Sequence, residues 1–258
     1  MFQTAVKFAL LFVTTILLAS CSGASMLRAI LPAPSQEEIA AARISIAPYC
    51  EEKSGARVFR TAENVDGFVY RSSVNYGNGL QNPPTEEWGS GCSYWCLKNL
   101  LNGFSYVEAE LQIAPTRREN RFDFVGAPAG FYRYEFAKRS GDNCARFDQM
   151  AKTNDALQSA IRSYPEILED QCVVGRPISS FEAKYQFEGY RVVRERHSHG
   201  TYIQEYGNQI VDRTNGNVLA NNSNLIVRNS KYGRTVLASC ELNQNTDIAP
   251  IDVLVPRN

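Results

Sequence analysis

The sequence is poor in the side chains that most often carry catalysis or bind metal ions. It contains two histidines in 258 residues, and its 27 basic side chains are balanced by 27 acidic ones. A chain without excess positive charge lacks the electrostatic surface that attracts nucleic acid, so we expect no nucleic-acid partner. The sequence also lacks the Gly-x-Ser-x-Gly, phosphate-loop and His-Glu-x-x-His motifs. These absences argue against nucleophile-elbow hydrolases, P-loop nucleotide enzymes and zinc proteases.

The two histidines, His197 and His199, stand close together. Spaced two apart on a strand, both imidazoles would project from one face, which is a ligand arrangement for a divalent metal ion. The alternative is a polar hairpin tip before Gly200, which needs no ligand. We favour the hairpin tip, because a zinc site normally needs further ligands, and we expect neither a metal nor another cofactor.

An enzyme without catalytic histidine would depend on paired carboxylates, as glycoside hydrolases do. Glu108 and Glu110 are a candidate pair. Positions two apart on a strand share a face, so the same spacing also describes a solvated strand surface. The sequence does not separate these interpretations, and it favours a protein that is not an enzyme.

The first residues of the chain have the three-part pattern of an export signal. Lys7 precedes the predominantly apolar run Phe8–Leu18, and small residues and Cys21 follow. As a helix this run would be about 16 Å long, against a hydrocarbon core of about 30 Å, so it is too short to span a membrane. We therefore interpret residues 1–20 as a cleaved signal peptide.

The four residues Leu18-Ala19-Ser20-Cys21 resemble the lipobox of bacterial lipoproteins. The resemblance implies that Cys21 becomes the mature N-terminus and carries a thioether-linked diacylglycerol, usually with a third, amide-linked acyl chain. Two or three acyl chains anchor a protein to a membrane almost permanently. In that family Ser22, as the residue after the cysteine, favours transfer to the outer membrane. The alternative is an ordinary signal peptide cleaved before Ser25. The family of the remaining chain is not recognised.

The cysteine count agrees with export to an oxidising compartment. Seven cysteines less Cys21 leave an even number, so we expect three disulfides and no free thiol. Cys144–Cys172 is the favoured local bridge. Cys92 and Cys96 are one helical turn apart, and we expect them to pair with different partners from the remaining two. Metal binding by the Cys-x-x-x-Cys spacing is the alternative, but no second pair or histidine lies nearby. The candidate disulfide cysteines are Cys50, Cys92, Cys96, Cys144, Cys172 and Cys240.

Short, turn-punctuated segments predict an α+β fold, an antiparallel sheet or meander covered by one or two helices and stapled by disulfides. Residues 21–34 are expected to be a tether, and residues 35–258 a single periplasmic domain, with a subdivision near 165–180 as the alternative.

A capping box begins a helix that we expect to end near Ile44, before Pro48. The predicted helices are 35–44, 94–101 and 143–164, and the predicted strands are 57–60, 67–71 (a hairpin), 104–111, 121–125, 131–137, 181–192, 201–211, 217–220, 225–227 and 235–240.

The segment 72–91 fits neither a helical nor a strand period. It contains Tyr76 and Trp88 and continues into Tyr94 and Trp95. Because long unpatterned loops are often functional, we take Tyr76, Trp88 and Tyr94 as candidate partner contacts. Trp95 and Leu97 are expected to pack inward from the following helix, and the favoured alternative is that this whole aromatic cluster is core.

These features predict a binding or assembly module of the bacterial cell envelope, attached through its N-terminal lipid and facing the periplasm, with an envelope protein or a glycan as partner. A cell-wall hydrolase that uses carboxylates is one alternative. An inhibitor or immunity-type lipoprotein is another. Fold-level reasoning alone does not choose among them.

Overall fold

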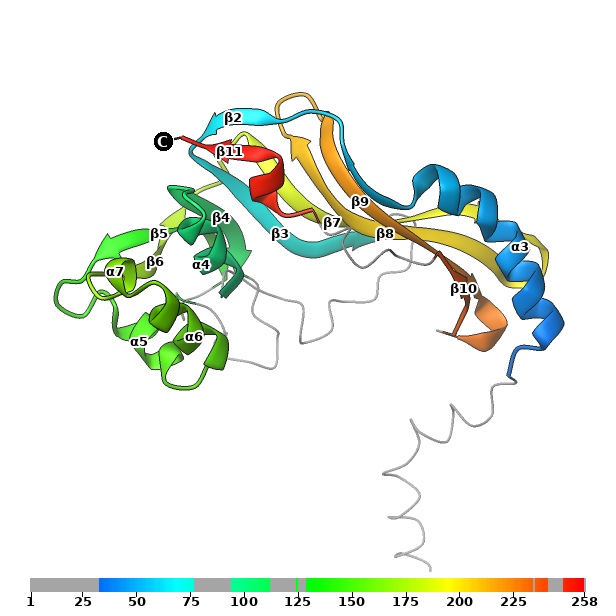
Figure 1. Ribbon diagram of the computed structural model, residues 1–258, viewed down its shortest axis with the longest axis horizontal. Helices are drawn as coiled ribbons and strands as arrows, with labels where there is room; N and C mark the ends of the chain where they lie inside the picture. The colour runs from blue at the N-terminus through cyan, green and yellow to red at the C-terminus, as the bar shows by residue number, and fades with distance from the viewer. Residues whose placement is uncertain are drawn as a thin grey trace, which may run out of the picture.

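The computed structural model describes residues 33–76, 94–111, 124, 129–233, 235–240 and 248–257. This part of the chain is an α+β structure built on one large, mostly antiparallel sheet, with helices at the two ends of the sheet (Figure 1). The predicted α+β class is confirmed. The described part contains five α-helices, where three helical segments were predicted and one or two were expected to cover the sheet: α3 (Gln36–Lys53), α4 (Tyr94–Leu101), α5 (Ala145–Ala151), α6 (Asp155–Ser163) and α7 (Pro165–Leu168).

The nine-stranded sheet has the order β1-β9-β8-β7-β3-β4-β5-β6, with β10 also paired to β9. A separate two-stranded sheet joins β2 and β11 in parallel. The strands are β1 (Gly55–Val58), β2 (Ala62–Val65), β3 (Gly67–Tyr76), β4 (Tyr106–Leu111), β5 (Gly130–Lys138), β6 (Gln171–Ile178), β7 (Tyr185–Arg196), β8 (Thr201–Asp212), β9 (Val218–Asn229), β10 (Val236–Ser239) and β11 (Leu254–Pro256).

Strand β3 departs from the predicted antiparallel pattern. It runs parallel to both of its neighbours, β4 and β7. The predicted hairpin of 57–60 with 67–71 is wrong, because β1 pairs with β9 and β3 lies inside the sheet. Parallel neighbours require crossover connections, and such long-range pairings leave no turn signal in the sequence. The sheet is therefore mixed.

Strands β7, β8 and β9 form an antiparallel meander as predicted, and each is twelve residues long. The predicted separate strands 217–220 and 225–227 are one continuous strand, β9. The β8–β9 turn contains Gly216 at φ 74°. The Asp212 carboxylate accepts hydrogen bonds from the Thr214 backbone (2.9 Å) and hydroxyl (2.5 Å) in this turn. In mid-strand, a Cβ on Gly207 would lie 1.7 Å from the Asn222 carbonyl oxygen, so this position admits only glycine.

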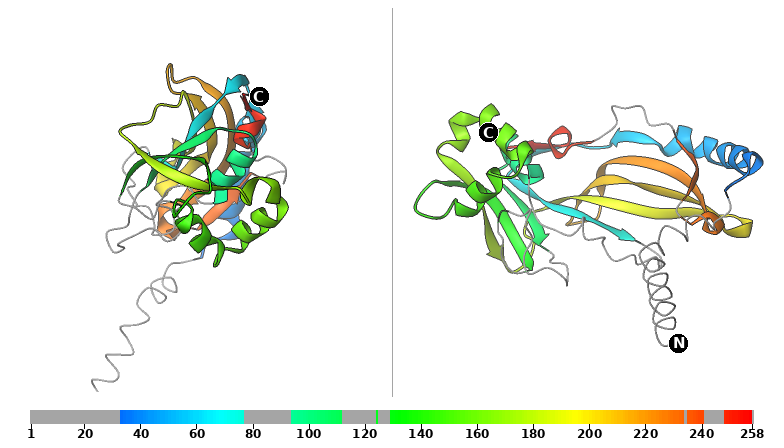
Figure 2. Two further views of the ribbon diagram at one scale, coloured as in Figure 1. Left: turned by 90° about the vertical axis from the view of Figure 1, so that its left-hand side faces the viewer. Right: turned by 90° about the horizontal axis from the view of Figure 1, so that it is seen from below.

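Two hydrophobic cores lie on opposite faces of this one sheet. The larger core includes Ile210 of β8, and the smaller one includes Ile203 of the same strand. These residues are seven positions apart on an unbroken strand, and successive side chains of a strand alternate between faces. The larger core lies under α4–α6, and the smaller lies under α3 at the opposite end of the molecule (Figures 1 and 2).

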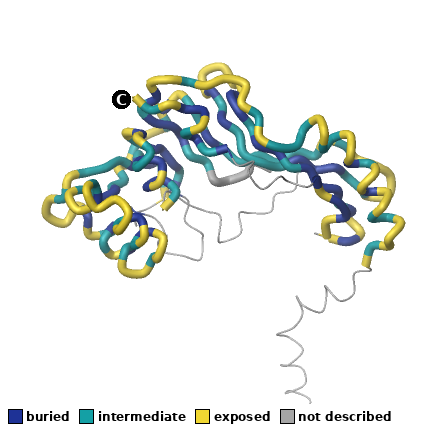
Figure 3. The backbone as a smooth tube through the Cα atoms, in the orientation of Figure 1, coloured by how far each residue is buried: buried dark blue, intermediate teal, exposed yellow. Residues whose placement is uncertain are grey.

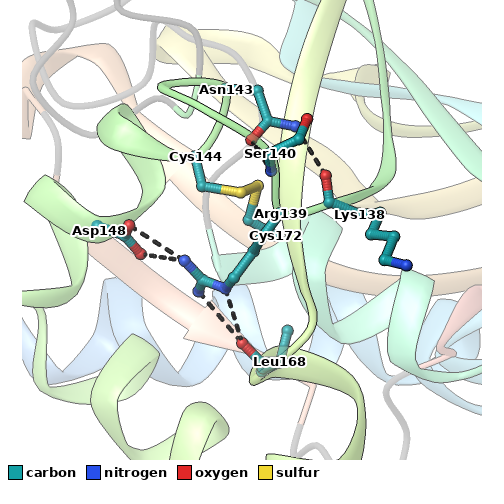
Figure 4. The surroundings of a disulfide bond; sticks show 8 residues. All are labelled: Lys138, Arg139, Ser140, Asn143, Cys144, Asp148, Leu168 and Cys172. Carbon is teal, nitrogen blue, oxygen red and sulfur yellow. Dashed lines mark hydrogen bonds and ion pairs between the residues drawn. A yellow bond between two sulfur atoms is a disulfide. The ribbon is translucent and has the colours of Figure 1, made fainter.

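Two disulfides join described residues. The predicted Cys144–Cys172 bridge is present, and it ties the start of α5 to β6 (Figure 4). Beside it, Arg139 binds the Asp148 carboxylate (2.8 Å) and the Leu168 carbonyl oxygen (3.2 Å), so the helical segment is fixed to the sheet at two further points.

The second bridge is Cys50–Cys240, which joins residues 190 positions apart. The prediction that these two cysteines pair with Cys92 and Cys96 is wrong. Helix α3 lies across β9 and β10 and brings Cys50 beside Cys240, with a Cα–Cα distance of 5.4 Å. Cys96 is buried and disulfide-bonded, and Cys92 lies outside the described residues.

Helix α3 continues past Pro48 to Lys53, so the predicted end near Ile44 is also wrong. Proline removes one intrahelical hydrogen bond, a cost that normally ends or bends a helix. Here the turns around Pro48 are held by the burial of Ile46 and by the Cys50 disulfide. The capping box at Ser35 and Glu38 forms as predicted, with hydrogen bonds of 2.8 and 3.1 Å.

Candidate functional site

Between the two cores, the middle of the sheet carries polar side chains on the face that α3 covers further along. We call this set the central belt: Gln186, Glu188, Tyr190, Arg194, Glu205 and Gln209. The β7–β8 register pairs Glu188 with Gln209 and Val192 with Glu205, which places the belt residues of the two strands on one face. Most of the belt is partly exposed, as the intermediate colouring of these strands in Figure 3 shows.

Glu188 organises one half of the central belt. Its two carboxylate oxygens accept hydrogen bonds from the side-chain amides of Gln186 (2.5 Å) and Gln209 (2.8 Å). Amide–carboxylate bonds of this kind hold both amides in fixed orientations. Gln186, Glu188 and Gln209 therefore form an ordered polar surface on adjacent strands.

Glu205 organises the other half and is 2% exposed. One of its oxygens accepts from the Tyr190 hydroxyl (2.8 Å) and the other from Arg194 Nε (2.5 Å). Burial, followed by the hydrogen bond to Glu205, raises the pKa of Tyr190 well above its usual value of 10. Tyr190 thus stays protonated and donates to the carboxylate, and Arg194 supplies the compensating charge.

Glu108, one of the two carboxylates proposed as a catalytic pair, is completely buried. One oxygen accepts from Arg133 (2.7 Å), and the other accepts from the backbone N–H groups of Glu182 (2.8 Å) and Ala183 (2.9 Å). This carboxylate ties β4 and β5 to the segment before β7. Glu110 is partly exposed, two residues further along β4.

The three predicted partner contacts, Tyr76, Trp88 and Tyr94, differ in where the structure places them. Tyr94 is the first residue of α4 and is 40% exposed. Tyr76 ends β3, where its backbone is paired with Arg191 of β7, and Trp88 lies outside the described residues. The prediction of a loop from residue 72 is wrong for residues 72–76, which form the end of β3 beside Tyr190 of the central belt.

The expectation that Trp95 and Leu97 pack inward is confirmed. Leu97 is fully buried, and Trp95 packs against the larger core. The Trp95 ring stacks on Tyr70 with a centroid distance of 4.4 Å and lies 5.0 Å from Phe187. These aromatic residues anchor α4 on the sheet.

The histidines lie at the β7–β8 connection, as the hairpin-tip interpretation predicts. His199 is in a short 3-10 turn with φ 60°, and His197 Nδ1 is 3.6 Å from the Glu195 carboxylate. The two imidazoles do not project from a shared strand. Within the described ranges, no three or more histidine, cysteine, aspartate or glutamate side chains are grouped as metal ligands.

Sequence reasoning missed the central belt. The alternation of 186, 188 and 190 predicts which side chains share a face, but it does not distinguish an ordered polar surface from a solvated one. The pairing of Tyr190 and Arg194 with Glu205 depends on the register with β8, which the sequence alone does not give.

The residues that carry the lipobox resemblance, including Cys21, lie outside the described part. No helix in the described part is both long enough and apolar enough to cross a membrane. Comparisons of the chain with protein-family models, with curated proteins and with solved structures found no match. Function is therefore inferred from the residues of this chain.

Proposed function

We propose that this protein is an envelope lipoprotein that acts as a binding or assembly module, held by acyl chains on Cys21 to the outer membrane and facing the periplasm. The lipobox-like Leu18–Cys21 sequence supports the anchor. The two disulfides support a location outside the cytoplasm, because such bonds persist in oxidising compartments.

The observation that supports the binding role is that three carboxylates of the sheet are hydrogen-bonded within the protein. In Glu108, Glu188 and Glu205, both oxygens accept hydrogen bonds from other groups of the protein. A general acid or base must lie within reach of the substrate, and Glu108 and Glu205 are in addition buried. These three carboxylates order a surface, which supports recognition over hydrolysis.

The contact surface that we propose is the central belt. Tyr94 is proposed as a separate contact, because Trp95 of the same helix packs on Phe187, whose side chain projects from the opposite face of β7 to Gln186 and Glu188. The β3–β7 register places Asn75 beside Tyr190, so the end of β3 borders the belt. Tyrosine, amide and guanidinium groups offer both stacking area and hydrogen bonds. The partner is an envelope protein or a glycan.

The contact surface can be tested by placing a photo-crosslinking amino acid at Gln209, in the central belt, and at Arg162, an exposed residue of α6, in cells of the native host. We expect a discrete crosslinked species from position 209 that is absent from position 162. The same crosslinks from both positions would contradict the proposed surface. Turnover of purified peptidoglycan by the wild-type protein would support the hydrolase alternative instead.

The anchor is tested separately by Cys21→Ser, which should give unprocessed or soluble protein, with Ser25→Ala as the matched control. The control should remain in the membrane fraction at the processed size. A Cys21→Ser protein that fractionates with membranes at the processed size would contradict lipidation. Processing that depends on Ser25 would favour the ordinary signal peptide.

A further inference from the structure

The two disulfides of the described part differ in accessibility. Cys144 is 4% exposed and Cys172 is fully buried, so both sulfur atoms of that bridge belong to residues of the larger core. In the other bridge Cys240 is 4% exposed, whereas Cys50 is partly exposed on α3. A thiol in solution can therefore approach one bridge at Cys50 and neither end of the other.

The accessible bridge is the covalent link between α3 and the sheet. Helix α3 is followed by Ser54 and then directly by β1, whose first residue, Gly55, has φ 96°. Cys240 follows β10 and donates its backbone N–H to the Leu225 carbonyl oxygen of β9. Among the described residues, cleaving this bridge leaves the short C-terminal connection of α3 as its covalent link to the sheet.

The non-covalent docking of α3 is light. Two of its eighteen residues, Ala42 and Ile46, are buried, and Tyr49 and Cys50 pack partly buried against the smaller core. The other attachments are hydrogen bonds: Tyr232 donates to Glu38 (2.6 Å), Tyr49 donates to Glu195 (2.5 Å), and the Ser223 hydroxyl donates to the Lys53 carbonyl oxygen. An isolated helix of this length with an internal proline is marginal in water. Helix α3 thus depends on its attachments for its structure.

We propose that Cys50–Cys240 is a redox-sensitive strap, whose reduction by a dithiol releases α3 from the sheet while Cys144–Cys172 stays oxidised. Release uncovers the apolar sheet face formed by Ile203, Leu225 and Val227, which α3 covers in the oxidised state. The inference rests on exposure and packing and does not depend on the proposed lipid anchor.

The exchange proceeds in two steps. A thiolate of the dithiol attacks Sγ of Cys50, the disulfide bond breaks, and Cys240 leaves as a thiolate that takes up a proton. The second thiolate of the dithiol then attacks the mixed disulfide and releases Cys50, which is also protonated. The dithiol ends as a disulfide, and its two electrons reside on the Cys50 and Cys240 thiols.

The test uses the full-length protein purified without reductant and exposed to graded dithiothreitol under native conditions. Newly formed thiols are alkylated and mapped by mass spectrometry, and amide exchange of α3 is followed in parallel. We expect Cys50 and Cys240 to be alkylated at least about tenfold faster than Cys144 and Cys172, and the amide protection of residues 42–53 to fall at least about tenfold. Equal alkylation rates, or an α3 that stays protected after Cys50 and Cys240 are reduced, would overturn the proposal.

A matched pair of variants separates release of α3 from general loosening. Cys50→Ser with Cys240→Ser should show, without reductant, the α3 exchange of the reduced wild-type protein. Cys144→Ser with Cys172→Ser should keep α3 protected until reductant is added. If the Cys50→Ser, Cys240→Ser variant keeps the amide protection that α3 has in the oxidised wild-type protein, the proposal is wrong. If either variant fails to fold, the dithiothreitol titration of the wild-type protein is a sufficient test.

Discussion

The two ends of the sheet are stabilised in different ways. At the β3–β6 end, large side chains such as Phe68, Phe147 and Leu157 are essentially fully buried, and the disulfide there closes a separation of 28 residues. At the far end, the smaller core lies under α3, and the bridge spans 190 residues. The first end resembles an ordinary apolar core, and the second depends on cross-links and polar contacts. With the proposed release of α3, stability and conformational change belong to different parts of one sheet.

The comparison is tested most strongly by Phe68→Ala in the larger core. Phe68 is fully buried and makes edge-on contacts with Phe104 (5.0 Å) and Trp95 (6.5 Å). Removing its ring should lower the free energy of unfolding by about 3–5 kcal/mol, measured by chemical denaturation. Phe59→Ala is the matched control, because Phe59 is 60% exposed and should change stability by less than about 0.5 kcal/mol. Similar losses in the two variants would contradict the assignment of the core.

Glu108→Gln should cost about 3 kcal/mol, because it leaves the Arg133 charge without its buried partner. The value is at the low end for a broken buried ion pair, since the Arg133 side chain is 26% exposed. Glu110→Gln, two residues along the same strand, should be nearly neutral. If the two variants have the same stability, Glu108 does not tie the sheet as described.

Tyr190→Phe tests how much the hydrogen bonds of the central belt, between the two ends of the sheet, contribute to stability. It removes the hydroxyl that donates to Glu205 and leaves one oxygen of a buried carboxylate without that donor. The expected loss is about 1–3 kcal/mol in denaturant unfolding. Tyr94→Phe, at the exposed start of α4, should leave stability unchanged. A neutral Tyr190→Phe would show that water replaces the hydroxyl and that the belt is less ordered than its contacts indicate.

The smallest expected effect is a loosening of α3 in acid. The hydrogen bond from Tyr232 is the largest of the contacts that lower the pKa of Glu38 from 4.5 to about 2. A depressed carboxyl pKa contributes stability above pH 4.5, and this contribution is lost as the pH falls from 4.5 towards 2. Amide exchange at the start of α3 should increase over that window. Tyr232→Phe should move the Glu38 titration, followed by NMR, towards higher pH, and an unchanged midpoint would contradict the assigned cause.

Local features were the ones that the sequence predicted well. The capping box at Ser35, the meander around Asn215-Gly216 and the Cys144–Cys172 bridge each involve residues close in sequence or a regular alternation. The parallel pairing of β3 and the Cys50–Cys240 bridge join distant segments, and no local pattern encodes such partners.

Two errors in the sequence analysis have the same physical origin, which is tertiary contact. Pro48 would end an isolated helix, but packing and a disulfide hold α3 beyond it. Glu108 alternates like a solvent-facing residue, yet it is fully buried because Arg133 and two backbone N–H groups satisfy it. Alternation identifies a face of a strand but does not reveal what covers that face.

The placement of two cores on opposite faces makes β8 a strand whose apolar phase changes along its length. Ile203 belongs to one phase and Ile210 to the other, and Gly207, where no side chain fits, lies between them. In a strand whose apolar residues all share one face, a one-residue slip moves all of them to the other face together. In β8, a one-residue insertion or deletion near Gly207 would leave the side chains of one core in place and move those of the other core to the opposite face of the sheet. The length of this short segment is therefore constrained more tightly than the identity of most of its residues.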